Sequence, residues 1–168
     1  MTAITNPLVN SYKRLVSGFE APLHIAWSVT NRSPLIRIPS SFGSGTRIEL
    51  RSPDSAANPY LTIALCLAAG LDGIKITPPE NIQKNIFHMT EQEKEQLHIK
   101  SLPTNLYDAV CAMERDAFIR EILGEHISNV YIGSKKDEWD RYCKTVTEWE
   151  VDTYLDKFKK GGWLSFDK

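Results

Sequence analysis

Strict alternation of charged and apolar residues at positions 47–51, within a strand candidate at 46–51, constrains this chain more than any other feature. A period of two belongs to an extended strand, whose successive side chains point to opposite faces. One face then carries Arg47, Glu49 and Arg51, and the other face carries two apolar residues. The pattern therefore predicts a strand that presents two guanidinium groups and a carboxylate on one side.

The segment before this strand is rich in loops and short extended runs. Residues 23–28 and 35–38 are further strand candidates, and a serine- and glycine-rich loop occupies residues 40–45. The Asn-Pro pair at position 6 predicts a short helix, which Gly18 terminates. We expect this part of the chain to supply strands rather than long helices.

From residue 56 onward the pattern becomes helical. Asn58 and Pro59 are a typical N-cap and first residue of a helix. The helix is predicted to run through an almost wholly apolar stretch to about Ala69, with a further extension to Ile74 left open. A helix that is apolar on all sides is usually buried, so we expect this one in the core. Residues 76–103 contain three prolines and few periodic apolar residues, which predicts a long surface connection.

More helices are predicted toward the C-terminus. Residues 106–122 have an amphipathic pattern with a possible interruption, and a second helix spans about 126–143. Thr147 and Glu150 form a capping box that opens a last helix, which runs to near Lys160.

These patterns predict an α+β fold in which a few antiparallel strands precede a mainly helical C-terminal half. We divide the chain into a strand-and-loop segment, residues 1–55, and a helical segment, residues 56–168. We expect both to belong to a single domain, for which 168 residues suffice. No apolar run is long enough to span a bilayer, and the N-terminus lacks a secretory signal. Three scattered cysteines are typical of a reducing compartment, so we expect a cytoplasmic protein without a membrane partner.

Positive charge is concentrated in the first 51 residues. The whole chain has a net charge of −1, yet this segment holds six basic residues and only two acidic ones. Five of the six cations are arginines, whose planar guanidinium groups bind phosphate or carboxylate through two parallel hydrogen bonds. The concentration of arginines favours one shared anion site.

The charged face of the strand at 46–51 has two interpretations. Arg47, Glu49 and Arg51 could form a ladder of ion pairs that serves only the structure. Alternatively, Glu49 could ligate a metal ion next to arginines that hold phosphate, an arrangement used in phosphoryl transfer. Residues alone leave both interpretations open.

Glu20 is the one carboxylate in a loop that Gly18 and Pro22 delimit. It could be a solvated turn residue, or it could lie on a movable flap that closes over a site and acts as a base. The four histidines lack metal-ligand spacing. A nucleic-acid partner is not expected, because aromatic residues are sparse among the basic ones and the chain is not basic overall.

A series of ordered motifs resembles type I glutamine synthetases, most closely the feedback-inhibited bacterial branch, over nearly the whole chain. The motifs are Asn6-Pro7 through Val16, Gly18-Phe19-Glu20-Ala21-Pro22, Asn31-Arg32-Ser33, Ile36-Arg37-Ile38-Pro39, Thr46 through Asp54, Ala57-Asn58-Pro59-Tyr60-Leu61, Ala69 through Ile74, and Val146 through Glu150. This ATP-dependent ligase of nitrogen metabolism makes glutamine from glutamate and ammonia through a γ-glutamyl phosphate. The resemblance implies that the strands belong to the catalytic barrel of that family.

The resemblance also implies roles for residues that handle the substrate. Arg14 would bind glutamate, and Arg51 would hold the substrate or the γ-phosphate. Arg32 would contact both the substrate and the transferring phosphate. Glu20 would be the flap carboxylate that covers the acyl phosphate and assists deprotonation of ammonium.

ATP and the metal would be held by a partly overlapping set. Arg32, Arg37 and Arg47 would contact the ATP phosphates, and Glu49 would ligate a Mg²⁺ or Mn²⁺ ion. Several carboxylates are needed for two such ions, and Glu49 is one. The family's other metal ligands lie upstream of anything seen here, so we expect no tight metal binding by this chain alone.

The chain departs from the family in several places, including Ser17 and Ser55 where proline is usual and an atypical loop at 41–45. The ending, residues 159–168, runs past the usual terminus. Because the family's enzyme is much longer, we expect a C-terminal catalytic fragment that is inactive alone. Missing strands would leave an apolar face uncovered, which predicts self-association; the family assembles as a double hexameric ring. The alternative is a non-catalytic regulatory module that associates with full-length synthetase.

Overall fold

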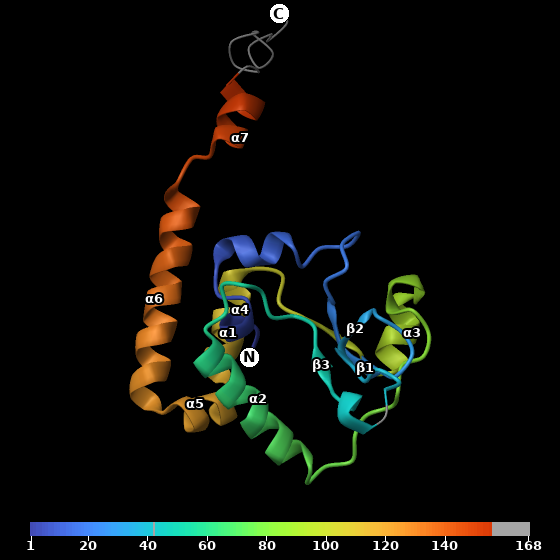
Figure 1. The fold of residues 1–168 in the computed structure, drawn as a ribbon. Helices are drawn as coiled ribbons and strands as arrows, with labels where there is room; N and C mark the ends of the chain where they lie inside the picture. The colour runs from blue at the N-terminus through green and yellow to red at the C-terminus, as the bar shows by residue number, and fades with distance from the viewer. Residues whose placement is uncertain (42, 156–168) are drawn as a thin grey trace, which may run out of the picture.

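The computed structural model describes residues 1–41 and 43–155 and confirms the α+β class. A small sheet lies on one side, and a group of helices lies on the other (Figure 1). The sheet has four strands in the order β3-β2-β1-β4. Their bounds are β1 His24–Ser28, β2 Pro34–Arg37, β3 Glu49–Leu50 and β4 Lys100–Ser101.

The sheet is mixed rather than wholly antiparallel as predicted. The pairs β2–β3 and β1–β4 are antiparallel, but β1 and β2 run parallel. The five residues between them double back along β1, because the Ser28 hydroxyl accepts hydrogen bonds from the backbone N–H groups of Thr30 (3.1 Å) and Asn31 (3.2 Å). This compact reversal replaces the hairpin that a short connection usually forms.

Strand β3 is shorter than the alternation at 46–51 predicts. The strand comprises Glu49 and Leu50, and Glu49 lies opposite Arg37; the backbone N–H of Arg51 donates one further bond to the Leu35 carbonyl of β2. A short 3₁₀ turn, η2 (Gly43–Gly45), precedes the strand. Arg47 therefore lies just before β3, and Arg51 lies just after it.

The main core lies between the N-terminal helices and those of the C-terminal half. Fully buried Ile4, Leu106 and Met113 belong to it. The elements are α1 (Thr2–Thr5), the 3₁₀ helix η1 (Val9–Lys13), α4 (Leu106–Arg115), α5 (Ala117–Leu123) and α6 (Glu125–Lys144). The possible interruption of the helix predicted for residues 106–122 is found at Asp116, which ends α4 and whose carboxylate caps α5 by accepting the N–H of Ile119.

Helix α2 (Pro59–Gly73) begins where the sequence predicts, since the Asn58 side chain accepts hydrogen bonds from the backbone of Tyr60 and Leu61. The prediction that it is buried is wrong. Leu65 packs in the core, but Leu67 and Leu71 are 64% and 67% exposed. One side of α2 packs on α1 and α5, and its opposite side has no covering element among the described residues.

Residues 76–103 are more structured than the predicted surface connection. They contain the 3₁₀ turn η3 (Ile86–His88), helix α3 (Glu91–Gln96) and strand β4. Ile82, Ile86 and Met89 form a second apolar cluster beneath the sheet. Hydrophobic periodicity did not predict this cluster, because its members come from a loop and a single turn and have no regular spacing.

The predicted capping box at Thr147 is confirmed and opens α7 (Glu148–Glu150), which continues into a π turn, η4 (Val151–Leu155). Figure 1 shows α7 beyond the end of α6, away from the body of the protein. The predicted continuation to Lys160 and the tail lie outside the described residues. Among the residues that the structure describes, no helix is long and apolar enough to cross a membrane.

Candidate active site

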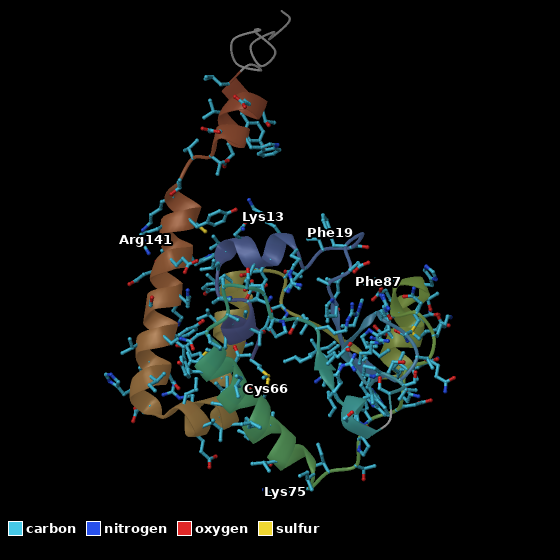
Figure 2. The ribbon with its side chains drawn as sticks, viewed as in Figure 1. Lys13, Phe19, Cys66, Lys75, Phe87 and Arg141 are labelled. Atoms are coloured by element: carbon cyan, nitrogen blue, oxygen red, sulfur yellow. The ribbon has the colours of Figure 1, made fainter. Side chains whose placement is uncertain are left out.

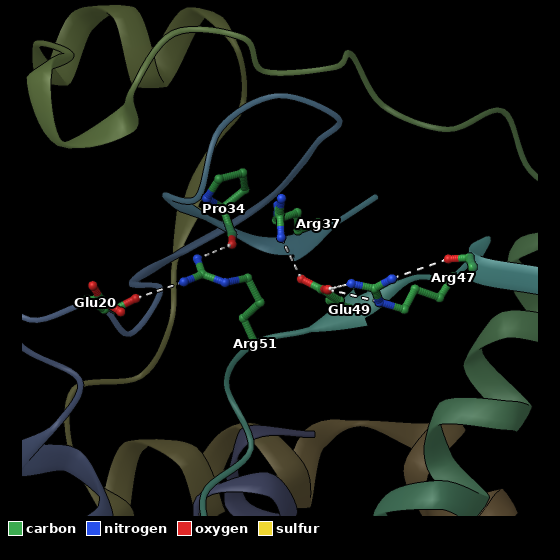
Figure 3. Close-up of polar contacts among 7 residues, drawn as sticks. Glu20, Pro34, Arg37, Arg47, Glu49 and Arg51 are labelled. Atoms are coloured by element: carbon green, nitrogen blue, oxygen red, sulfur yellow. Dashed lines mark hydrogen bonds and ion pairs between the residues drawn. The ribbon is translucent and has the colours of Figure 1, made fainter. Parts of the chain in front are cut away.

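Arg37 and Arg47 hold the same carboxylate where the edge strand β3 pairs with β2. Arg37 Nη1 donates to Glu49 Oε2 at 3.1 Å, and Arg47 donates to Glu49 Oε1 through Nη2 at 2.7 Å and Nε at 3.0 Å. Figure 3 shows Glu49 between the two guanidinium groups. Antiparallel pairing of β2 with β3 creates this contact, because it places Arg37 opposite Glu49.

Both arginines keep Glu49 ionised. The hydrogen bond from Arg47 is the largest cause of the lowered pKa of the Glu49 carboxyl, and Arg37 lowers that pKa further. Glu49 is thus a carboxylate at neutral pH, and both its oxygens are engaged.

Arg51 turns away from Glu49 toward the flap. Its Nη2 donates to the Glu20 backbone carbonyl at 3.1 Å, and its Nη1 reaches the Pro34 carbonyl at 3.5 Å (Figure 3). Burial lowers the pKa of the Arg51 guanidinium, and the nearby charges of Arg37 and Arg32 lower it further. Repulsion among these cations is offset only in part by Glu20 and Glu49, so an anion bound here would gain favourable electrostatic energy.

Three of the predicted residues meet at one cavity of about 260 Å³: Glu20, Arg32 and Arg51. Phe19 also lines it, from the flap that follows Gly18. Gly18 has a φ of 96°, a left-handed conformation that favours glycine. The positive-φ glycine lets the chain turn sharply and brings Glu20 to the cavity.

Besides Phe19, four residues at this cavity were not predicted as site residues: Asn31, Ser33, Asn85 and Phe87. The first two flank Arg32 in a motif that was noted only for the resemblance. Phe87 belongs to η3, and Figure 2 shows it on the segment that faces the sheet. An aromatic residue in an aperiodic, proline-containing stretch gives no local signal that it will line a site.

Arg14 is not among the residues that line the cavity. Its Nη2 donates to the carbonyl of Ser52, the residue after Arg51, and its Nε is buried without a hydrogen-bond partner among the described residues. Arg14 thus contacts the chain just beyond β3 and supports the segment that carries Arg51.

The described residues do not by themselves fit a divalent metal ion. No group of three or more histidine, cysteine or carboxylate side chains comes together within residues 1–41 and 43–155. Glu49 offers one carboxylate, and arginines occupy both its oxygens. The donor set fits an anion with several oxygens, such as a phosphate or carboxylate.

A sheet edge with clustered arginines, one ionised carboxylate and a nearby loop that carries a second carboxylate is an arrangement suited to holding a phosphate or carboxylate group. The family described as the glutamine synthetase catalytic domain matches residues 1–154. The chain belongs to this family.

Curated relatives of this chain belong to the same family. The chain is 52% identical over 160 residues to a glutamine synthetase of Clostridium saccharobutylicum, covering 94% of this chain and 36% of the relative. It is 55% identical over 159 residues to one of Staphylococcus aureus (strain MW2), again covering 94% of this chain and 36% of the relative. It thus spans about a third of the length of the curated relatives that it matches.

Solved structures confirm the fold. The structure titled "Apo GmaS without ligand" superposes with a TM-score of 0.75 at 41% identity, covering 92% of this chain and 34% of that one. The structure titled "GmaS/ADP complex-Conformation 1" gives a TM-score of 0.76 at the same identity. That protein is thus known with ADP bound.

Proposed function

We propose that this chain supplies the arginine-bearing wall of a glutamine synthetase active site, which joins glutamate and ammonia at the expense of ATP. The observation that carries this proposal is the convergence of Glu20, Arg32 and Arg51 on one cavity, next to the ion pairs of Arg37 and Arg47 with Glu49. Membership of the family supports the choice of reaction. We further propose that residues 1–55 and 56–168 form one catalytic unit.

The arginines divide into two groups in this proposal. Arg37 and Arg47 bind ATP phosphates, and Arg32 serves both these phosphates and the transferring phosphoryl group. Arg51, together with Arg14 behind it, holds glutamate at the cavity. Fixed positive charges placed where negative charge develops lower the barrier of phosphoryl transfer, because they need no reorganisation during the reaction.

Glu20 and Glu49 have different tasks. Glu20 lies at the cavity, where its carboxylate covers the acyl phosphate and accepts a proton from ammonium. Glu49 is our proposed ligand for Mg²⁺ or Mn²⁺, but arginines hold both its oxygens in the chain alone. Further carboxylates would have to come from outside the described residues, and we expect no tight metal binding and no synthetase activity from this chain by itself.

We also propose that the chain self-associates and resides in the cytoplasm. The exposed apolar side of α2 supports self-association. The cysteines at positions 66, 111 and 143 are all unpaired, which suits a reducing compartment.

Titration of the chain with inorganic triphosphate, followed by NMR of arginine Nε–H groups, tests the anion wall. We expect signals of Arg37 and Arg47 to shift, and Arg47→Gln to weaken binding by roughly tenfold, since hydrogen bonds between charged groups contribute about 1.5–3 kcal/mol. Arg141→Gln is the matched control, because Arg141 lies on α6, well away from the sheet (Figure 2). Equal weakening by both variants would contradict the proposal.

A further inference from the structure

Asn31 connects two segments that lie about fifty residues apart in the chain. It belongs to the reversal between β1 and β2, and its Nδ2 donates to the carbonyls of Ile82 (2.6 Å), Gln83 (3.2 Å) and Lys84 (3.2 Å). One side-chain amide thus contacts three successive backbone carbonyls of the segment that leads into η3. These contacts, of which the one to Ile82 is the shortest, restrain the segment next to Asn31.

Ser33 completes this connection. Its hydroxyl donates to Asn31 Oδ1 at 2.8 Å and accepts the backbone N–H of Ile86 at 3.0 Å. The Ser33 backbone N–H also donates to Asn31 Oδ1 at 2.8 Å. Ser33 is 5% exposed and Ile86 is fully buried, so these bonds are shielded from competing water.

The two connected segments both line the cavity that holds Glu20 and Arg51. Arg32 stands between Asn31 and Ser33, and Asn85 and Phe87 flank Ile86; all of these except Ile86 line the cavity. Phe87 is also fixed from behind by an edge-on contact with the His24 ring, whose centroid lies 6.1 Å away. The spacing between Arg32 and Phe87 therefore depends on the bonds of Asn31 and Ser33.

We propose that Asn31 and Ser33 are positioning residues that clamp the 82–87 segment against Arg32 and thereby set which amino-acid substrate the cavity accepts. The inference rests on the proposed function, in which this cavity holds glutamate. Neither side chain has to touch the reacting atoms for this role. They act through Arg32 on one side and through the Asn85–Phe87 wall on the other.

Asn31→Asp is the variant that tests the amide donor most directly. It keeps the side-chain oxygen that accepts from Ser33, but it places a carboxylate oxygen against three carbonyls in place of the amide donor. We expect the backbone amides of Ile82 and Ile86 to exchange hydrogen at least about tenfold faster, relative to the amide of Val110 in the same molecule. Val110 lies in the separate main core, so this ratio removes any effect of global stability. A tenfold change corresponds to about 1.4 kcal/mol.

Ser33→Ala is the second variant, and Asn58→Ala is the matched control. Ser33→Ala leaves the buried Ile86 N–H without its acceptor and should accelerate exchange at that amide. Asn58 also accepts two backbone hydrogen bonds, but it caps α2 and does not line the cavity. An unchanged exchange ratio in both clamp variants, or an equal change in Asn58→Ala, would overturn the clamp.

Ligand binding tests the consequence for the substrate. We expect L-glutamate and the shorter L-aspartate, titrated into the unaltered chain by NMR, to differ in affinity, and Asn31→Asp to reduce that difference by about tenfold. A merely structural role would lower both affinities without changing their ratio, and that result would overturn the specificity role. If the unaltered chain shifts no cavity signals with either ligand, the proposed function fails, whereas the exchange experiment still decides whether the clamp exists.

Discussion

Replacing Arg51 with glutamine is expected to lower the rate of glutamine formation by roughly 10²–10³-fold, the usual cost of removing a fixed group that stabilises transition-state charge. The measurement uses a chimaera in which this chain replaces the 159-residue segment that it matches in the Staphylococcus aureus relative. Arg51 is the most consequential position because two backbone carbonyls orient it toward the cavity. Its charge also lies among those of Arg32 and Arg37.

The control for this variant is Arg141→Gln in the same chimaera. Both substitutions remove one guanidinium, but Arg141 lies on α6 and bonds to the carbonyl of Asp137 within its own helix. We expect the control to retain full activity and both variants to assemble to the size of the unaltered chimaera. An Arg51→Gln rate within about threefold of the unaltered rate would show that this arginine contributes little to the barrier, since threefold is less than 1 kcal/mol.

Self-association of the chain should depend on the exposed side of α2. No charged residue occurs between positions 59 and 71, so two copies can bring these helices together without electrostatic repulsion. We expect the double substitution of Leu67 and Leu71 by lysine to raise the dissociation constant by about 100-fold or more. Each leucine lost from an apolar contact costs roughly 1.5 kcal/mol, and about 1.4 kcal/mol is a tenfold change.

Sedimentation velocity over a range of concentrations measures this effect. Val130→Lys is the control, because Val130 is also an exposed apolar residue but lies on α6. A chain that remains monomeric at all concentrations before any substitution would contradict the role of α2, as would loss of association in the Val130 variant.

Local signals predicted much of this fold. The N-cap at Asn58 and the capping box at Thr147 are confirmed, because each depends on residues within a few positions of one another. An interruption of the helix at 106–122 was also predicted, but its position at Asp116 was not. Parallel pairing of β1 with β2 was not predicted, because it depends on a reversal held by side-chain hydrogen bonds of Ser28. Burial of α2 was mispredicted for a related reason. Composition indicates that a helix needs an apolar environment, but not which residues provide one.

The candidate site was likewise predicted only in part. Arg32, Arg51 and Glu20 were predicted and do meet at one cavity, and Arg37 and Arg47 were predicted and both contact the predicted Glu49. Whether these residues have the proposed catalytic roles stays a prediction. The wall formed by Asn85 and Phe87 was missed, because tertiary hydrogen bonds to Asn31 and Ser33 bring it to the cavity from fifty residues away.

Glutamine formation by the unaltered chimaera tests the central claim most directly. If this chain supplies a working arginine wall, the chimaera should convert glutamate, ammonium and ATP to glutamine at a rate comparable with that of the Staphylococcus aureus relative, and the 168-residue chain alone should form none. A chimaera that folds and assembles like the relative, yet forms no glutamine, would contradict the claim.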